Sequence, residues 1–154
     1  MPFESVIAPV YDGTMTSVVY EGSSFTAPSP NNIVRTNQDW GVHLEWTMSG
    51  PALLFLENFN PDAVFRLLTY LERIGPGGGT VLPNPAMEVG IASGVLAGNS
   101  RTYTADLQFA AGSVPVGNYH LTSVVQLYHD AAPAGTPVPI GGFIELPMVM
   151  FFNP

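Results

Sequence analysis

The stretch AGSVPVGNYHLTSVVQLYHD, residues 111–130, decides the predicted fold class because it joins a turn to a long alternating segment. Gly112, Pro115 and Gly117 mark the turn, and from Tyr119 onward the residues fall into two sets at a spacing of two. That spacing is typical of a β-strand with one face on the core. The face expected to point inward carries Tyr119, Leu121, Ser123, Val125 and Leu127.

Two other segments alternate as cleanly. The strand predicted at Trp40–Met48 has an inner face made of Trp40, Val42, Leu44, Trp46 and Met48. The strand predicted at Arg101–Phe109 has an inner face made of Tyr103, Ala105, Leu107 and Phe109. Because consecutive strands are usually neighbours, we expect Arg101–Phe109 to pair with Tyr119–Tyr128.

Shorter strands and one apolar C-terminal strand complete the predicted sheet content. The short strands are expected at Thr14–Tyr20, Ile33–Thr36, Ala52–Leu56 and Met87–Ile91. The C-terminal strand is expected at 142–152, after a proline-rich loop at Ala131–Pro139. Pro147 has no N–H to donate to a central ladder, so it predicts an edge or a bulge there.

The segment Ala63–Ile74 fits two kinds of element. Pro61 before it and Gly75 after it match the start and stop signals of a short helix, and apolar residues recur at helical spacing. The same segment also alternates as a strand and lies between other strand-like segments. The surrounding sequence favours the strand, and a short helix at 63–74 remains the alternative.

The order PVGNYHL at 115–121 resembles the start of a late strand in immunoglobulin-like and fibronectin-type-III-like sandwiches. In those folds a tyrosine just inside the strand closes a corner through its hydroxyl group, so the resemblance implies that role for Tyr119. It also implies an all-β, antiparallel immunoglobulin-like sandwich. We expect one domain over residues 1–154, with an extended N-terminal segment at 1–32.

Charged side chains are scarce. Four arginines and twelve acidic residues give a net charge of −8, and there is no lysine. Charged residues make up 10% of the chain, whereas globular domains carry about 25%. Since the cores of protein interfaces are depleted in charge, this composition favours a surface that contacts other chains.

The same composition argues against several classes of partner. An acidic chain without a basic patch is a poor ligand for nucleic acids or anionic membranes. No apolar run reaches the length of a membrane span, and no basic segment precedes an apolar one at the N-terminus. A cytoplasmic location is the default expectation, with other export routes and a processed mature chain left open. The absence of cysteine removes disulfides and thiolate chemistry.

Candidate chemical sites are weak. His43 and Glu45 share a strand face and would form a metal site with His120 if their strands were neighbours. The residues considered as calcium ligands from loops at the ends of the sandwich are Asp12, Asp39, Asp106 and Asp130. Neither set has a motif spacing, and no nucleophile motif or phosphate-binding glycine loop is present, since Gly75–Gly79 lacks the required context. We therefore expect no cofactor, no metal and no catalytic residue.

Exposed aromatic residues are the remaining candidates for ligand binding. Both tryptophans lie on an apolar strand face, which predicts core packing, so Tyr11, Tyr70 and Tyr128 are left as platforms for a carbohydrate. The loops Gly75–Pro85 and Ala131–Pro139 would serve another small ligand.

The first hypothesis is a non-enzymatic structural or assembly subunit that binds protein partners, either copies of itself or other chains. The expected interaction surface is the apolar end of the last strand, which comprises Pro147, Met148, Val149, Met150, Phe151 and Phe152. A ligand-binding module is the alternative, and an enzyme without a recognisable motif is the third hypothesis.

Overall fold

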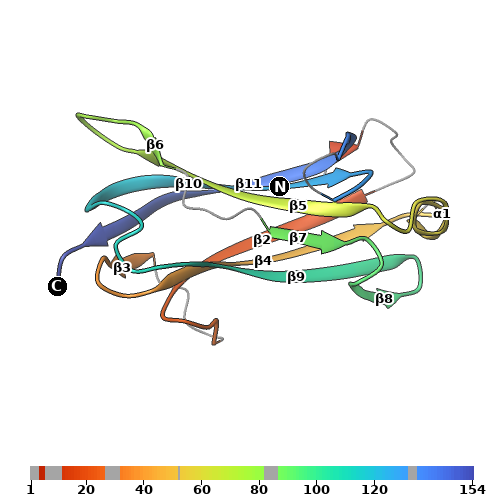
Figure 1. Cartoon of the computed structure of the whole chain (residues 1–154), viewed down its shortest axis with the longest axis horizontal. Helices are drawn as coiled ribbons and strands as arrows, with labels where there is room; N and C mark the ends of the chain where they lie inside the picture. The colour runs from red at the N-terminus through yellow and green to blue at the C-terminus, as the bar shows by residue number, and fades with distance from the viewer. Residues whose placement is uncertain (1–3, 6–11, 27–31, 52, 82–86, 132–134) are drawn as a thin grey trace.

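Two facing β-sheets and one short helix make up the computed structural model, which describes residues 4–5, 12–26, 32–51, 53–81, 87–131 and 135–154. The sheets form two layers with the side chains of the core between them (Figure 1). The helix α1 (Leu53–Phe59) joins the layers at one end. The predicted all-β class is therefore confirmed at the level of a two-sheet protein.

The smaller sheet contains four antiparallel strands. Their order across the sheet is β2 (Asp12–Glu21), β4 (Trp40–Ser49), β9 (Ser100–Phe109) and β8 (Val95–Ala97). Every residue predicted to face inward on β4 and β9 is buried, as the spacing of two requires. The sequence therefore predicted the faces of both strands correctly.

The larger sheet is built around β10 (Gly117–Tyr128), which lies between β5 (Val64–Arg73) and β11 (Pro137–Phe152). Its short outer strands are β1 (Glu4–Ser5), β3 (Ile33–Arg35), β6 (Thr80–Val81) and β7 (Met87–Gly90). The strands β1 and β3 pair with β11, and β6 and β7 pair with β5. The predicted inner face of β10 is buried along its whole length.

Aromatic rings join the two sheets in two clusters, one toward each end of the core. At the helical end, Trp46 stacks on Tyr103 at a centroid distance of 5.1 Å, and Phe65 of the opposite sheet meets both rings edge-on. At the other end, Trp40 stacks on Phe109, and Phe151 contacts Trp40 across the sheets. Both tryptophans are core residues, as predicted.

The predicted pairing of Arg101–Phe109 with Tyr119–Tyr128 is wrong. β9 and β10 belong to different sheets, and the chain crosses from one sheet to the other between Ala110 and Val116. Val114 is buried under this crossing, and Gly112 has the positive φ of 74° that the turn needs. The spacing of two specifies which face of a strand is apolar, but it does not specify the sheet to which the strand belongs.

The buried strand predicted at Ala52–Leu56 is also wrong, because Leu53–Phe59 forms α1. Residue 52 lies outside the described residues. A short apolar run does not distinguish a buried strand from a helix. Here Gly50, with φ of 139°, turns the chain after β4, and the helical spacing then buries Leu53 and half-buries Leu56 and Glu57.

The ambiguous segment Ala63–Ile74 forms the strand β5, so the favoured interpretation is confirmed and the helix is not observed. Phe65, Leu67 and Leu71 are buried on its inner face.

The last strand begins at Pro137, five residues earlier than expected, so Pro137–Pro139 is strand and not loop. Its pairing with β10 shifts register between Leu146 and Val149, which confirms a bulge at Pro147.

Candidate functional site

The helix α1 carries the most exposed aromatic side chains in the described part of the chain. Phe55 is 68% exposed and Phe59 is 80% exposed. They are four residues apart on the helix, so they share its outer side, and their rings stack at a centroid distance of 5.7 Å. Two adjacent phenylalanines outside a core have no role in burying that core, so their position needs another explanation.

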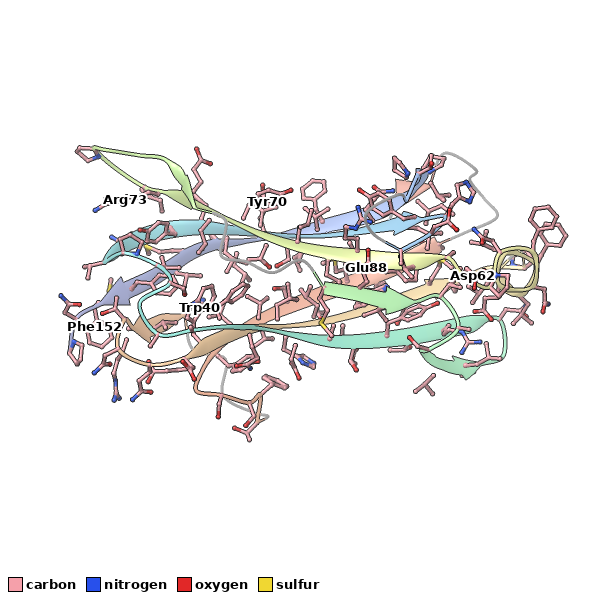
Figure 2. All side chains as sticks on the ribbon, in the orientation of Figure 1. Trp40, Asp62, Tyr70, Arg73, Glu88 and Phe152 are labelled. Carbon is pink, nitrogen blue, oxygen red and sulfur yellow. The ribbon has the colours of Figure 1, made fainter. Side chains whose placement is uncertain are left out.

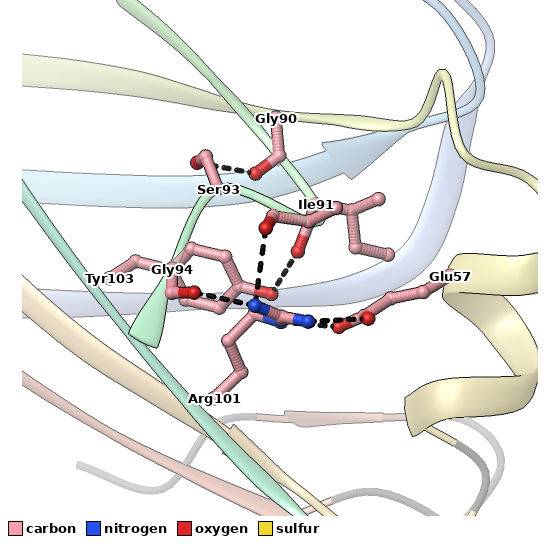
Figure 3. A network of polar contacts seen from close by, with 8 residues as sticks. Glu57, Gly90, Ile91, Ser93, Gly94, Arg101 and Tyr103 are labelled. Atoms are coloured by element: carbon pink, nitrogen blue, oxygen red, sulfur yellow. Dashed lines mark hydrogen bonds and ion pairs between the residues drawn. The ribbon is translucent and has the colours of Figure 1, made fainter. Parts of the chain in front are cut away.

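A buried ion pair holds α1 against the smaller sheet. Arg101 on β9 donates from Nε to Glu57 Oε1 at 2.6 Å and from Nη2 to Glu57 Oε2 at 2.7 Å. Its Nη1 also donates to the carbonyl oxygens of Ala92 and Gly94, at 3.1 and 2.5 Å (Figure 3). One guanidinium group therefore connects the helix, β9 and the loop before β8. This planar, two-bond geometry is the strongest that an arginine makes with a carboxylate.

The pKa shifts of two groups indicate that the contact between α1 and the smaller sheet persists at neutral pH. The hydrogen bond from Arg101 to Glu57 raises the pKa of the Arg101 guanidinium above its ordinary value. Burial raises the pKa of the Tyr103 hydroxyl, which donates a hydrogen bond to the carbonyl oxygen of Ile91 at 2.6 Å. Both groups keep their protons near neutral pH, so these contacts persist and α1 presents its phenylalanines on a rigid support.

The strand β8 adds one aliphatic side chain to the same surface. Leu96 is 45% exposed and pairs with Arg101, so it lies on the sheet face from which Arg101 reaches α1, and β8 is at the same end of the molecule as α1 (Figure 1). Val95 pairs with Thr102 and points to the outer face of the smaller sheet. We call this surface the end patch. Its residues are Leu54, Phe55, Phe59 and Leu96.

The end patch is almost without charge. Segment 91–99 (IASGVLAGN) has no ionisable side chain, and Glu57 is the only one within α1. Arg101 neutralises Glu57 from beneath. Asp62 is exposed and lies close to α1, at the rim of the surface (Figure 2).

The segment predicted to bind partners, Pro147–Phe152, is divided between the core and the surface. Val149 and Phe151 are buried in the chain's own core, and Phe151 contacts the ring of Tyr119. Met148 and Met150 are 52% and 38% exposed. A partner can therefore reach only some of these side chains without unfolding the sandwich.

The structure separates the predicted metal ligands. His43 and Glu45 lie on the smaller sheet, whereas His120 lies on the outer face of the larger one, so the three cannot meet. His43 instead contacts Asp106 of β9, at 2.6 Å between Nδ1 and Oδ1, and Phe25 stacks on its ring. Among the described residues, no group of three or more histidine and acidic side chains is arranged to hold a metal ion.

The four aspartates considered for calcium also stay apart, and most have other roles. Asp39 accepts a hydrogen bond from the Ala111 amide, and Asp12 accepts one from the Gly13 amide. Asp106 contacts His43, and Asp130 is exposed after β10. Among the described residues, these four carboxylates therefore do not converge on one site.

The tyrosines predicted as platforms are only partly accessible. Tyr128 is covered by Arg66, whose Cζ lies 3.9 Å from the ring centroid, and Glu88 in turn pairs with Arg66. Tyr70 is half-buried and points away from the core on the outer face of the larger sheet (Figure 2). Tyr11 lies outside the described residues, as do parts of the loops Gly75–Pro85 and Ala131–Pro139.

The loop Gly75–Gly79 forms the hairpin turn between β5 and β6, which Arg73 and Gly79 close with a backbone hydrogen bond. Gly75 and Gly77 have positive φ angles, as such a turn requires. The segment is therefore a turn between two strands, whereas a phosphate-binding loop lies between a strand and a helix.

Sequence reasoning missed the end patch entirely. The apolar run Ala52–Leu56 predicts a buried strand, and a buried strand gives no reason for Phe55 to point outward. One signal was available: Pro51 before the segment and Asn60-Pro61 after it match the start and stop rules of a short helix. The Arg101–Glu57 contact joins residues 44 apart and has no local signature.

Comparisons with known proteins do not identify a family for this chain. No protein-family model and no curated protein matches the sequence. A solved structure, the X-ray structure of a Northeast Structural Genomics Consortium target, is similar with a TM-score of 0.37 and 9% identity, over 92% of this chain and 89% of that one. In the described residues, no helix is long and apolar enough to cross a membrane.

Proposed function

We propose that the protein is a non-enzymatic assembly subunit that binds other protein surfaces through its end patch. The observation that carries this proposal is the stacked, exposed Phe55–Phe59 pair on a helix fixed by the Arg101–Glu57 contact. Aromatic side chains on a rigid support are the usual anchors of protein interfaces, because they bring a large apolar area at a low cost in conformational entropy.

The charge distribution supports the same proposal. Three of the four arginines make ion pairs within the chain, with Glu21, Glu57 and Glu88. In the end patch, Arg101 likewise neutralises Glu57, and the two most exposed phenylalanines of the described residues lie there. Interface cores are depleted in charge and enriched in aromatic residues, which matches the end patch better than any other described surface.

We also propose that the two sheets form an immunoglobulin-like sandwich. Support comes from the strand order β2-β4-β9-β8 facing β5-β10-β11, which corresponds to ABED facing CFG in that family. The Tyr119 hydroxyl donates to the carbonyl oxygen of Pro115 at 2.9 Å, the contact expected of a tyrosine corner. The chain lacks the cysteine pair, and both tryptophans lie on β4, which departs from antibody domains.

Photochemical crosslinking in the cells that produce the protein natively tests the assembly function. A benzophenone amino acid at Phe55 is expected to form covalent adducts of discrete mass. The same group at His120, an exposed position on the outer face of the larger sheet, serves as the control and is expected to form none. The absence of adducts at Phe55, or equal adducts at both positions, contradicts the proposal.

A further inference from the structure

We infer that the partner at the end patch is a second copy of this chain, bound across a two-fold axis so that α1 and β8 of each copy meet. This inference rests on the proposed assembly function and names its partner. In a two-fold contact the same residues lie on both sides, so the surface must be complementary to itself. A flat, uncharged pair of stacked rings meets that condition.

The first argument concerns charge, because charge limits the surfaces at which two copies of this acidic chain can meet. Two chains that each carry −8 repel each other, and acidic groups that face each other at close range oppose association. The outer face of the larger sheet has an apolar row, Leu68, Val124 and Phe143, but the carboxylates of Glu72 and Glu145 lie on the same face. The end patch has one carboxylate, Glu57, and Arg101 neutralises it.

The available area is the second argument. A phenylalanine side chain has about 150–250 Å² to bury, so exposures of 68% and 80% leave roughly 200–400 Å² on the two rings. Leu54 and Leu96 add to that area. A standard interface buries about 800 Å² per partner, of which somewhat more than half is apolar. The end patch therefore supplies most of the apolar core that a stable dimer needs.

Rigidity is the third argument, because a preformed surface loses little entropy on binding. The Arg101 guanidinium makes four hydrogen bonds to α1 and to the loop before β8. A methyl group added at Gly94 would lie 2.6 Å from the Thr102 carbonyl oxygen, so this loop packs directly on β9. Both halves of the end patch are thus held in the position in which a second copy would meet them.

Sedimentation equilibrium on the purified chain tests the inference with a matched pair of variants. Wild type is expected to move from the monomer mass of 16.4 kDa toward twice that value as concentration rises. The F55S/F59S variant is expected to associate at least about tenfold more weakly. The M148S/M150S variant removes two other exposed apolar side chains and is expected to behave as wild type.

The dependence of association on salt concentration distinguishes a second copy of this acidic chain from a basic partner protein. Because Asp62 of both copies lies at the rim, added salt is expected to strengthen dimerisation by screening the repulsion. A wild-type chain that stays monomeric at every concentration overturns the inference, as does a dimer that only M148S/M150S disrupts. An adduct at Phe55 with a different protein, in the crosslinking experiment, overturns the second copy while it supports the assembly function.

A crosslink keeps the test decisive if the serine variant fails to fold. The chain has no cysteine, so Asn58→Cys on α1 and Val116→Cys at the opposite end each introduce a single thiol. A short bis-maleimide is expected to join two N58C chains and not two V116C chains. Equal crosslinking of both variants, or none of N58C, contradicts the two-fold contact.

Discussion

The two ends of the sandwich use aromatic residues in opposite ways. At the end where β10 begins, Tyr119, Trp40 and Phe151 are all buried, and polar contacts close the surrounding loops. At the helical end, Trp46 and Tyr103 are buried in the same manner, but Phe55 and Phe59 lie outside. At the first end these aromatic side chains only fill the core. At the helical end two of them fill the core and two others lie exposed on the surface.

This difference has a structural cause. The crossing between β9 and β10 folds back over the core, where Ser113 accepts a hydrogen bond from Trp40 Nε1 at 2.9 Å. The connection between β4 and β5 is instead a helix, which can bury only one side. Leu53 is on that side, so the opposite side of α1 remains exposed.

The largest expected effect is at the ion pair of the helical end. Arg101→Met leaves the Glu57 carboxylate buried without a partner and is expected to lower the free energy of unfolding by about 3–5 kcal/mol. Urea denaturation followed by tryptophan fluorescence measures the change. The double variant E57L/R101M, which leaves no unpaired charge, is expected to recover part of this loss, and no recovery would mean that the charge is not the cause.

Alkaline pH is expected to destabilise the end of the molecule where β10 begins, because the Tyr20 hydroxyl lies there. Burial raises the pKa of the Tyr20 hydroxyl to about 12, and the nearby Asp106 carboxylate adds to this rise. Unfolded tyrosine titrates near 10, so between about pH 10 and 12 the unfolded chain releases a proton that the native chain keeps. Stability is therefore expected to be complete below pH 10 and to fall between about pH 10 and 12, by about 1–2 kcal/mol for this group.

The control for the alkaline effect is Tyr20→Phe, measured by denaturation at several pH values. In wild type, Gln108 donates a hydrogen bond to the Tyr20 hydroxyl, and the Tyr20 ring lies across Gly41, where a larger residue would clash. The variant keeps the ring and removes the titrating group. Its stability is expected to fall less steeply between pH 10 and 12, and an unchanged slope would exclude Tyr20 as the cause.

A smaller effect is expected at the corner. Tyr119→Phe removes the hydrogen bond to the Pro115 carbonyl oxygen and keeps the ring in its contact with Phe151. We expect a loss of about 1 kcal/mol in the free energy of unfolding. Thermal unfolding of both proteins measures it, and a loss near zero would show that the hydroxyl does not stabilise this corner.

The smallest effect on stability is expected at the end patch. The F55S/F59S variant is expected to change the free energy of unfolding by no more than about 0.5 kcal/mol per site in dilute solution, because exposed rings contribute little to the monomer. Denaturation at a low protein concentration measures this. A loss of several kcal/mol would show that the rings stabilise the fold and would remove the main support for the assembly function.

The sequence predicted local features well and long-range ones poorly. The spacing of two identified the inner faces of β4, β9 and β10, because a strand face depends on adjacent residues. The resemblance at PVGNYHL implied a hydrogen bond from the Tyr119 hydroxyl to nearby backbone, and the structure contains that bond, to the Pro115 carbonyl oxygen. The pairing of β9 with β4 and the contact between Arg101 and Glu57 depend on how distant segments meet. The spacing of residues within one segment does not predict contacts between distant segments.

The end patch illustrates the same limit. An apolar run is expected to be buried, and only the helical path of Leu53–Phe59 shows that Phe55 points outward. The predicted interaction segment Pro147–Phe152 was chosen by the same reasoning, and there two of the most apolar side chains, Val149 and Phe151, belong to the core. The low charge content predicts an interface, and the proposed place for it depends on the fold.

The most direct test of the difference between the two ends is amide hydrogen exchange, measured on the wild-type chain at low and high protein concentration. If the end patch is the contact surface, peptides that cover Leu53–Phe59 and Val95–Ala97 exchange more slowly at high concentration. Peptides that cover Pro147–Phe152 then exchange at the same rate in both samples. Slower exchange confined to Pro147–Phe152, or no change anywhere, would contradict the account.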